Sequence, residues 1–99
     1  MINKNIFKSA RHTSSYLSSG PVDGPLVMFF HGWPELSYSW RHQLKYFGEK
    51  GFHVIAPDMR GYGDSTVHDN KADYSQREIV RDMVELFQSF NKDNAIIIG

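Results

Sequence analysis

The sequence predicts an α/β fold with a mostly parallel sheet and flanking helices. The first observation is a set of three apolar runs of strand length, which occupy residues 26–30, 52–56 and 95–98. The second is an amphipathic helical pattern between each successive pair of these runs. Strand, helix and strand within about thirty residues form a βαβ unit with a right-handed crossover. The strands of such a sheet are covered by helices on both faces.

Two further strands are predicted before the first apolar run. Residues 6–11 and 13–18 have mixed polarity, which is typical of edge strands near a sheet margin. The run Gly-Pro-Val-Asp-Gly-Pro at residues 20–25 then predicts a loop, because proline presets φ and glycine accepts positive φ. The core of the sheet is therefore expected to begin at Leu26.

The first helix is predicted from Ser37 onward. Trp40, Leu44 and Phe47 are spaced i, i+4 and i+7, so they share one helical face. Gly51 follows this pattern and is the expected C-cap glycine at which the helix ends.

The second helix has a well-specified start. Ser75 and Glu78 have the spacing of a capping box, and Tyr74 and Ile79 have the spacing of the hydrophobic staple around it. The apolar residues that follow at helical spacing predict its buried stripe, which consists of Ile79, Met83, Phe87 and Phe90.

Composition limits the classes of function. The chain has 99 residues, equal numbers of basic and acidic side chains and no cysteine. A net charge of zero argues against a nucleic-acid surface, and no apolar run is long enough to span a membrane. The N-terminus lacks the apolar core of a signal peptide, so we expect a cytoplasmic protein of one domain. Without cysteines or histidines at metal-ligand spacing, we expect no metal and no cofactor.

Candidate site residues lie where the parallel strands end, because α/β proteins bind ligands at that edge of the sheet. Residues 31–34 read His-Gly-Trp-Pro. Gly32 lets the backbone approach a ligand, and Pro34 makes the Trp33–Pro34 bond a candidate cis peptide in a rigid turn. Such a turn aims an amide N–H at a developing negative charge. The alternative, which turn chemistry alone leaves open, is a tight loop that holds Trp33 in a cleft.

Two longer segments carry a resemblance to a known family. Residues 31–43, which read His-Gly-Trp-Pro-Glu-Leu-Ser-Tyr-Ser-Trp-Arg-His-Gln, resemble the α/β-hydrolase family and especially its epoxide hydrolases. Residues 56–65, which read Ala-Pro-Asp-Met-Arg-Gly-Tyr-Gly-Asp-Ser, resemble the segment after the fourth strand of that family. The resemblance implies a partial α/β-hydrolase domain over residues 1–99, truncated at the fifth strand. It also implies that the strand at 26–30 lies between the other two apolar strands and parallel to both.

The resemblance further implies the roles of the candidate residues. The backbone N–H of Trp33 contributes to an oxyanion hole, and the surrounding loop is supported by His31, Gly32, Pro34 and Glu35. A second, structural loop consists of Asp58, Arg60, Gly61, Gly63 and Ser65. The general base of the family lies near the C-terminal end of its domain, so His31 is expected to support the loop and not to act as the base. The glycines at 61 and 63 do not begin a dinucleotide loop, because Thr66 occupies the position of the third glycine.

The implied reaction opens an epoxide to a diol through an ester on an aspartate nucleophile, with a small-molecule epoxide or a related electrophile as the substrate. In the family the nucleophile stands two residues beyond the position of Gly99, and the triad acid, the base and the lid tyrosines follow. None has a counterpart here, so we expect the chain alone to be inactive. The alternatives are a haloalkane or haloacid dehalogenase, a serine esterase, and a non-catalytic truncated product or ligand-binding member of the fold. The sequence makes no prediction of oligomeric state.

Overall fold

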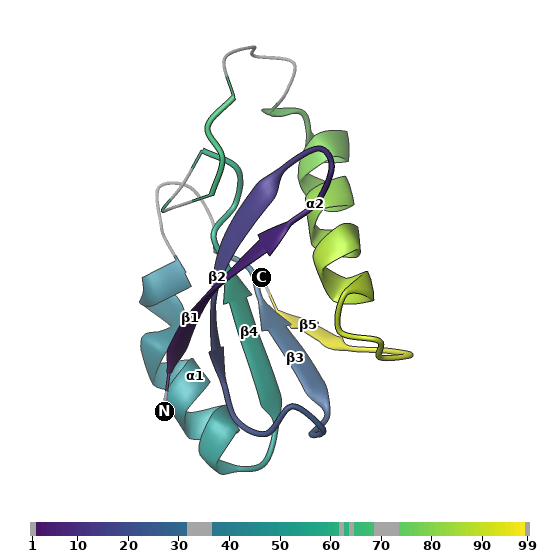
Figure 1. Cartoon of the computed structure of the whole chain (residues 1–99). Coiled ribbons are helices and arrows are strands. Elements are labelled where there is room, and N and C mark those ends of the chain that lie inside the picture. The colour runs from purple at the N-terminus through teal and green to yellow at the C-terminus, as the bar shows by residue number, and fades with distance from the viewer. Residues whose placement is uncertain (1, 32–36, 62, 64, 69–73, 99) are drawn as a thin grey trace.

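A computed structural model describes residues 2–31, 37–61, 63, 65–68 and 74–98. Its elements, in chain order, are β1 (Asn3–Lys8), β2 (Thr13–Ser19), β3 (Leu26–Phe29), the 3-10 helix η1 (Ser37–Trp40), α1 (Arg41–Glu49), β4 (His53–Pro57), α2 (Gln76–Gln88) and β5 (Ile96–Ile98). Figure 1 shows the sheet with α1 and α2 on its two sides. In the part of the chain described, no helix is long and apolar enough to cross a membrane.

The strands form one mixed sheet in the order β1-β2-β4-β3-β5. The pairs β1–β2 and β2–β4 are antiparallel, whereas β4, β3 and β5 are parallel to one another. In the parallel part, Val27 lies opposite Val54 on one side and opposite Ile96 on the other. The predicted central position of the strand at 26–30 is therefore confirmed, and so is the mostly parallel α/β architecture.

The two N-terminal strands differ from the prediction. β1 ends at Lys8, because residues 9–12 form the turn of a hairpin and not the end of a strand. The backbone N–H of Ser9 donates to the carbonyl of His12 at 2.9 Å, and the Ser9 hydroxyl accepts from the N–H groups of Arg11 and His12. β1 lies at the sheet edge, but β2 pairs on both sides, so its prediction as an edge strand was wrong. Its polar residues tolerate this position because Ser15 is hydrogen-bonded.

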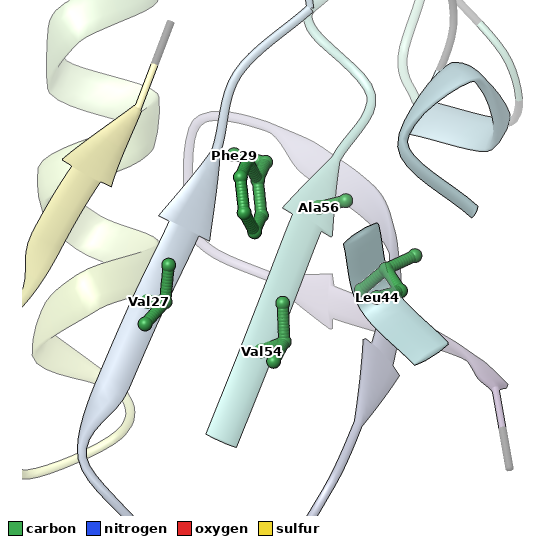
Figure 2. Packing of buried hydrophobic residues seen from close by; sticks show 5 residues of the cluster. All are labelled: Val27, Phe29, Leu44, Val54 and Ala56. Carbon is green, nitrogen blue, oxygen red and sulfur yellow. The ribbon is translucent and has the colours of Figure 1, made fainter. Parts of the chain in front are cut away.

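One face of the parallel strands packs against α1. Alternate residues of the two central strands point to this face and form a cluster with Leu44, as Figure 2 shows; they are Val27 and Phe29 of β3 and Val54 and Ala56 of β4. The Phe29 ring also lies 4.9 Å from the Trp40 ring and 5.8 Å from the Phe47 ring, centroid to centroid. The predicted apolar face of the first helix is thus the face that packs on the sheet. Burying a leucine of this kind stabilises a fold by roughly 1.5–3 kcal/mol.

The opposite face of the same strands packs against α2. Leu26, Met28 and Ile55 form its centre with Leu86, which is fully buried. The predicted stripe of the second helix omits Leu86, although that residue stands three positions after Met83 and so belongs to the same helical face. Both faces of β3 and β4 are consequently buried, which explains why their sequences are continuously apolar and do not alternate.

The ends of the two helices follow local signals. Gly51 has a φ of +94°, and its N–H donates to Gly48 while that of Phe52 donates to Phe47, which is the pattern of a Schellman motif. The Phe47 and Phe52 rings meet edge to face at 5.8 Å. At the start of α2, the Ser75 hydroxyl accepts from the N–H of Glu78 at 3.3 Å, so the predicted N-cap is confirmed.

Candidate functional site

The carboxyl ends of β3 and β4 are neighbours in the sheet, so the residues that follow each strand lie side by side (Figure 1). His31 follows β3, and residues 58–61 follow β4. Gly32, Trp33, Pro34 and Glu35 lie outside the described residues, so the cis Trp33–Pro34 bond and the oxyanion amide stay predictions. What the structure shows is how the flanks of that segment are held.

The buried ring of His31 contacts the backbone that follows β4. Its Nε2 accepts a hydrogen bond from the backbone N–H of Met59 at 3.0 Å. An imidazole nitrogen that accepts such a bond carries no proton, so a neutral ring has its proton on Nδ1. The bond joins His31, which follows β3, to the backbone after β4.

Asp58 is buried and connects four parts of the chain. Its Oδ1 accepts from the N–H of Ser37 at 2.7 Å, and its Oδ2 accepts from the hydroxyl of Ser15 at 2.9 Å. Its own N–H donates to the carbonyl of Ser15, and its carbonyl accepts from the hydroxyl of Ser65 at 2.7 Å. β2, β4, η1 and the loop at Ser65 are therefore joined at one residue.

The two described glycines of the second loop fit closely against their neighbours. Gly63 has a φ of +53°, and a Cβ there would overlap the carboxylate of Asp58. Gly61 has a φ of +85°, and a Cβ there would lie 2.8 Å from the Tyr74 ring. Positive φ and close approach both require glycine at these two positions. The Ser65 hydroxyl, which is buried, also accepts from the N–H of Ser15 at 2.9 Å.

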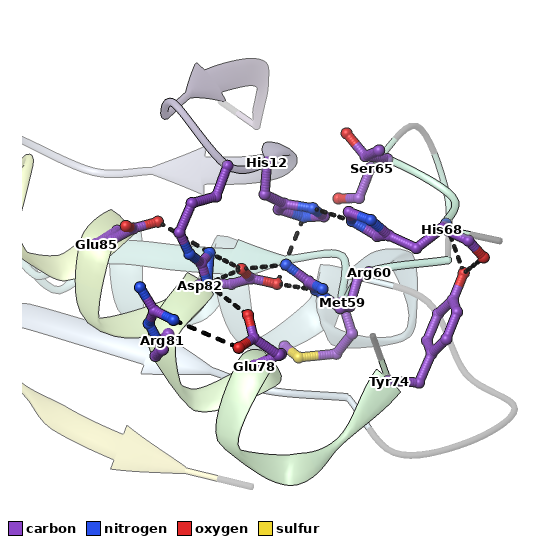
Figure 3. Close-up of polar contacts among 12 residues, drawn as sticks. His12, Met59, Arg60, Ser65, His68, Tyr74, Glu78, Arg81, Asp82 and Glu85 are labelled. Atoms are coloured by element: carbon purple, nitrogen blue, oxygen red, sulfur yellow. Dashed lines mark hydrogen bonds and ion pairs between the residues drawn. The ribbon is translucent and has the colours of Figure 1, made fainter. Parts of the chain in front are cut away.

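Arg60 belongs to an ion-pair cluster on the α2 side of the sheet, shown in Figure 3. Its side chain is only 3% exposed; Nε lies 2.6 Å from Oδ2 of Asp82, and Nη2 lies 2.9 Å from Oδ1. Arg11, from the β1–β2 turn, also pairs with Asp82 and with Glu78 and Glu85 of α2. The guanidinium of Arg60 thus links the loop after β4 to α2, and that of Arg11 links the hairpin to α2.

Two imidazoles complete this cluster. Nδ1 of His12 lies 2.9 Å from Nε2 of His68, and the hydroxyl of Tyr74 bonds both backbone polar groups of His68. Burial lowers the pKa of His12, and the charge of Asp82 opposes that shift. Sequence reasoning overlooked Asp82, Arg11 and the role of His12. A signal for Asp82 was present, because a carboxylate four residues before Leu86 lies on the buried stripe of the helix and needs a partner there.

A groove of about 770 Å³ separates α2 from the sheet near these strand ends. Its walls are mostly apolar, with the following lining residues: Met28, Phe30, His31, Met59, Arg60, Tyr74, Ile79, Val80, Met83, Val84, Phe87, Ala95 and Ile97. This volume lies within the range of small-molecule pockets. Among the described residues, no three histidine or acidic side chains converge as metal ligands.

Comparisons with known proteins agree on one family. A family model described as alpha/beta hydrolase fold matches residues 25–99. The chain is 45% identical to Epoxide hydrolase 1 of Siraitia grosvenorii over 76 residues, which are 77% of this chain and 24% of that protein. It is 37% identical to Epoxide hydrolase A of Mycobacterium tuberculosis over 83 residues, or 84% of this chain and 26% of that protein.

Solved structures show the same similarity. Epoxide hydrolase A from Mycobacterium thermoresistibile superposes with a TM-score of 0.94 at 32% identity, over 100% of this chain and 31% of that one. An epoxide hydrolase from Vigna radiata superposes with a TM-score of 0.91 at 33% identity, over 97% of this chain and 30% of that one. The chain spans about a quarter of the length of the curated relatives that it matches.

Proposed function

The chain belongs to the α/β-hydrolase fold family, and on that premise we propose that it supplies the oxyanion-loop side of an epoxide hydrolase active site. The observation that carries this proposal is the sequence similarity to epoxide hydrolases over a segment that includes the predicted oxyanion loop, together with the similarity of the fold to a solved epoxide hydrolase. The anchored flanks of that loop support it, because His31 and Ser37 are both hydrogen-bonded to the residues that follow β4. The proposed substrate is a small-molecule epoxide or a related electrophile.

In the proposed reaction a carboxylate oxygen attacks an epoxide carbon, the carbon–oxygen bond of the ring breaks as the ester forms, and the ring oxygen takes up a proton. Water then attacks the carbonyl carbon of this ester; the bond from that carbon to the diol oxygen breaks and a proton is given up, which releases the diol and restores the carboxylate. The attack of water places negative charge on the carbonyl oxygen. The role of this chain in the reaction is to donate a hydrogen bond from the backbone N–H of Trp33 to that negative charge. One such donor typically contributes roughly 3–4 kcal/mol to the stability of the transition state. Nucleophile, triad acid and base have no matching positions in residues 1–99, so the proposal includes inactivity of the chain alone.

Two polypeptides test the proposal. The first is residues 1–99, and the second joins them to the part of the Siraitia grosvenorii relative that follows its aligned segment. Both are assayed against styrene-oxide-type and aliphatic epoxides, haloalkanes and aryl esters. We expect epoxide hydrolysis only from the longer polypeptide, with loss of turnover when the carboxylate nucleophile is replaced by its amide. Turnover by residues 1–99, or activity of the longer form on esters or haloalkanes alone, would refute the proposal.

Variants at Trp33 separate the amide from the side chain. Trp33→Ala keeps the backbone N–H, whereas Trp33→Pro removes it. In the longer polypeptide, Trp33→Pro is expected to lower kcat by about a hundredfold or more, and Trp33→Ala far less. Equal loss in both variants would show that the indole ring, and not the amide, matters for turnover.

A further inference from the structure

We propose that His12 and His68 form a pH-sensitive contact, which holds the loop after β4 against the β1–β2 turn and opens when both imidazoles are protonated. Nδ1 of His12 lies 2.9 Å from Nε2 of His68, and the two ring planes are inclined by only 19° (Figure 3). At that distance the two nitrogens share one proton, because one must donate and the other accept. Neither residue takes part in the proposed function.

The surroundings of His12 determine where its proton lies. Its side chain is 2% exposed, and its Nε2 lies 3.6 Å from Oδ2 of Asp82, whose side chain is 1% exposed. In the described part of the chain Nε2 makes no hydrogen bond, so Asp82 acts on it through charge. A nearby carboxylate favours a proton on the nitrogen that faces it. We therefore assign the proton of neutral His12 to Nε2, which leaves Nδ1 to accept from Nε2 of His68.

Protonation of this pair proceeds in two steps with different consequences. The first proton binds to Nδ1 of His68, a partly exposed residue, and Nε2 of His68 still donates to Nδ1 of His12. The second proton must bind to Nδ1 of His12, where it meets the N–H of His68. Two donors 2.9 Å apart cannot bond, and two imidazolium charges repel each other, so the contact is lost.

Charged groups from every element packed against His12 act on its protonation. They are Arg11 from the same turn, Arg60 and His68 from the loop after β4, and Asp82 of α2, with Glu78 and Glu85 of α2 paired to Arg11. Burial lowers the pKa of His12, the charge of Asp82 opposes this shift, and the charges of the two arginines and of His68 add to it. The closed contact thus binds fewer protons than the open one. It is stable above the ordinary histidine pKa of 6.5, and its stability falls as the pH drops below that value.

Contacts without titratable groups hold the inner part of the loop after β4 to β2. The Ser65 hydroxyl accepts from the N–H of Ser15 at 2.9 Å. The N–H of Thr66 donates to the carbonyl of Thr13 at 2.9 Å, and the N–H of Thr13 donates to the hydroxyl of Thr66 at 3.0 Å. These bonds do not depend on pH, so the amide of Thr66 is an internal reference.

The outer part of the loop is held through His68. Its ring contacts His12, and its backbone N–H and carbonyl bond the hydroxyl of Tyr74 at 2.8 and 3.0 Å. Tyr74 precedes α2 and lines the groove between α2 and the sheet. Loss of the contact between His12 and His68 should therefore loosen the bonds between His68 and Tyr74, and with them one wall of the groove.

His68→Gln and His12→Leu separate the contact from its titration. The side-chain amide of glutamine carries a donor and an acceptor and does not titrate, so His68→Gln can pair with His12 in either protonation state. His12→Leu keeps an apolar side chain in the buried site and removes the contact at every pH. His53→Gln is the matched control, because His53 is also buried with a lowered pKa but packs on Phe90 at the opposite end of β4.

Hydrogen exchange followed by amide proton–nitrogen spectra tests the proposal on residues 1–99 between pH 8 and pH 5. In the unaltered chain, the protection of the residue-68 amide relative to that of Thr66 should fall by up to about tenfold per pH unit once the second proton binds. His68→Gln should keep this ratio constant, and His12→Leu should show the low ratio already at pH 8. His53→Gln should behave as the unaltered chain does.

A constant ratio in the unaltered chain, an equal fall in His68→Gln, or a full ratio in His12→Leu at pH 8 would overturn the proposal. So would a loss of protection at Thr66 in step with residue 68, because acid would then unfold the chain as a whole and not open this contact. Should His68→Gln not fold, His12→Asn decides by the same criterion, since the asparagine amide also carries a donor and an acceptor and does not titrate.

Discussion

Replacing Asp82 by alanine removes the carboxylate on which two guanidiniums converge. The side chain of Asp82 is 1% exposed, that of Arg60 3% and that of Arg11 22%. Arg11 keeps Glu78 and Glu85 as partners, so the main loss falls on Arg60, which gives up a bidentate pair with N–O distances of 2.6 and 2.9 Å. Removing one partner of a buried pair typically costs about 3–5 kcal/mol. A domain of this size has about 5–15 kcal/mol of stability in total, so the loss is a large fraction of it.

Urea unfolding followed by far-ultraviolet circular dichroism measures this loss. We expect Asp82→Ala to lower the free energy of unfolding by about 3 kcal/mol or more, which corresponds to a drop in Tm of roughly 12 °C or more. Glu85→Ala removes a longer, half-exposed contact to Arg11 and should lose less than about 1 kcal/mol. The double variant Asp82→Leu with Arg60→Met replaces the pair by apolar groups and should be more stable than Asp82→Ala. A loss below about 1 kcal/mol for Asp82→Ala, or a double variant less stable than the single one, would refute this reasoning.

Two further predictions concern pH and association. Burial lowers the pKa of both His12 and His53 below the ordinary 6.5, so the unfolded chain takes up protons that the folded chain does not. The free energy of unfolding should therefore fall as the pH drops below about 6.5, by at most about 1.4 kcal/mol per pH unit for each histidine, until the folded pKa values are passed. Urea unfolding from pH 8 to 5 checks this: His12→Gln should flatten the profile, and a flat profile in the unaltered chain would contradict the prediction. Ile96 on β5 is 53% exposed at the sheet edge, so Ile96→Lys should reduce self-association in sedimentation measurements with little change in stability, and unchanged association would exclude this edge as the contact.

The elements that the sequence predicts well are those whose signals are local. The apolar runs predict the three parallel strands because both faces of such strands are buried, which leaves continuous hydrophobic sequence. The helix ends were predicted at Ser75 and Gly51 because capping depends on the residue at one position and the backbone within one turn of it. His31 and Asp58 were predicted as candidate residues because each follows a parallel strand, and α/β proteins bind ligands at that edge of the sheet.

Contacts between distant segments were decided only by the tertiary structure. Asp58 meets Ser15 and Ser37 across 43 and 21 residues of sequence, and Arg11 meets Asp82 across 71. No local pattern encodes such pairs, because they depend on which strands are neighbours and on the register of their pairing. The sequence by itself therefore determined the α/β class, the parallel strand core and the region of the candidate site. Tertiary packing decided where the first hairpin turns, that Asp82 is the carboxylate shared by Arg11 and Arg60, and that His31 and Ser37 are bonded by Met59 and Asp58.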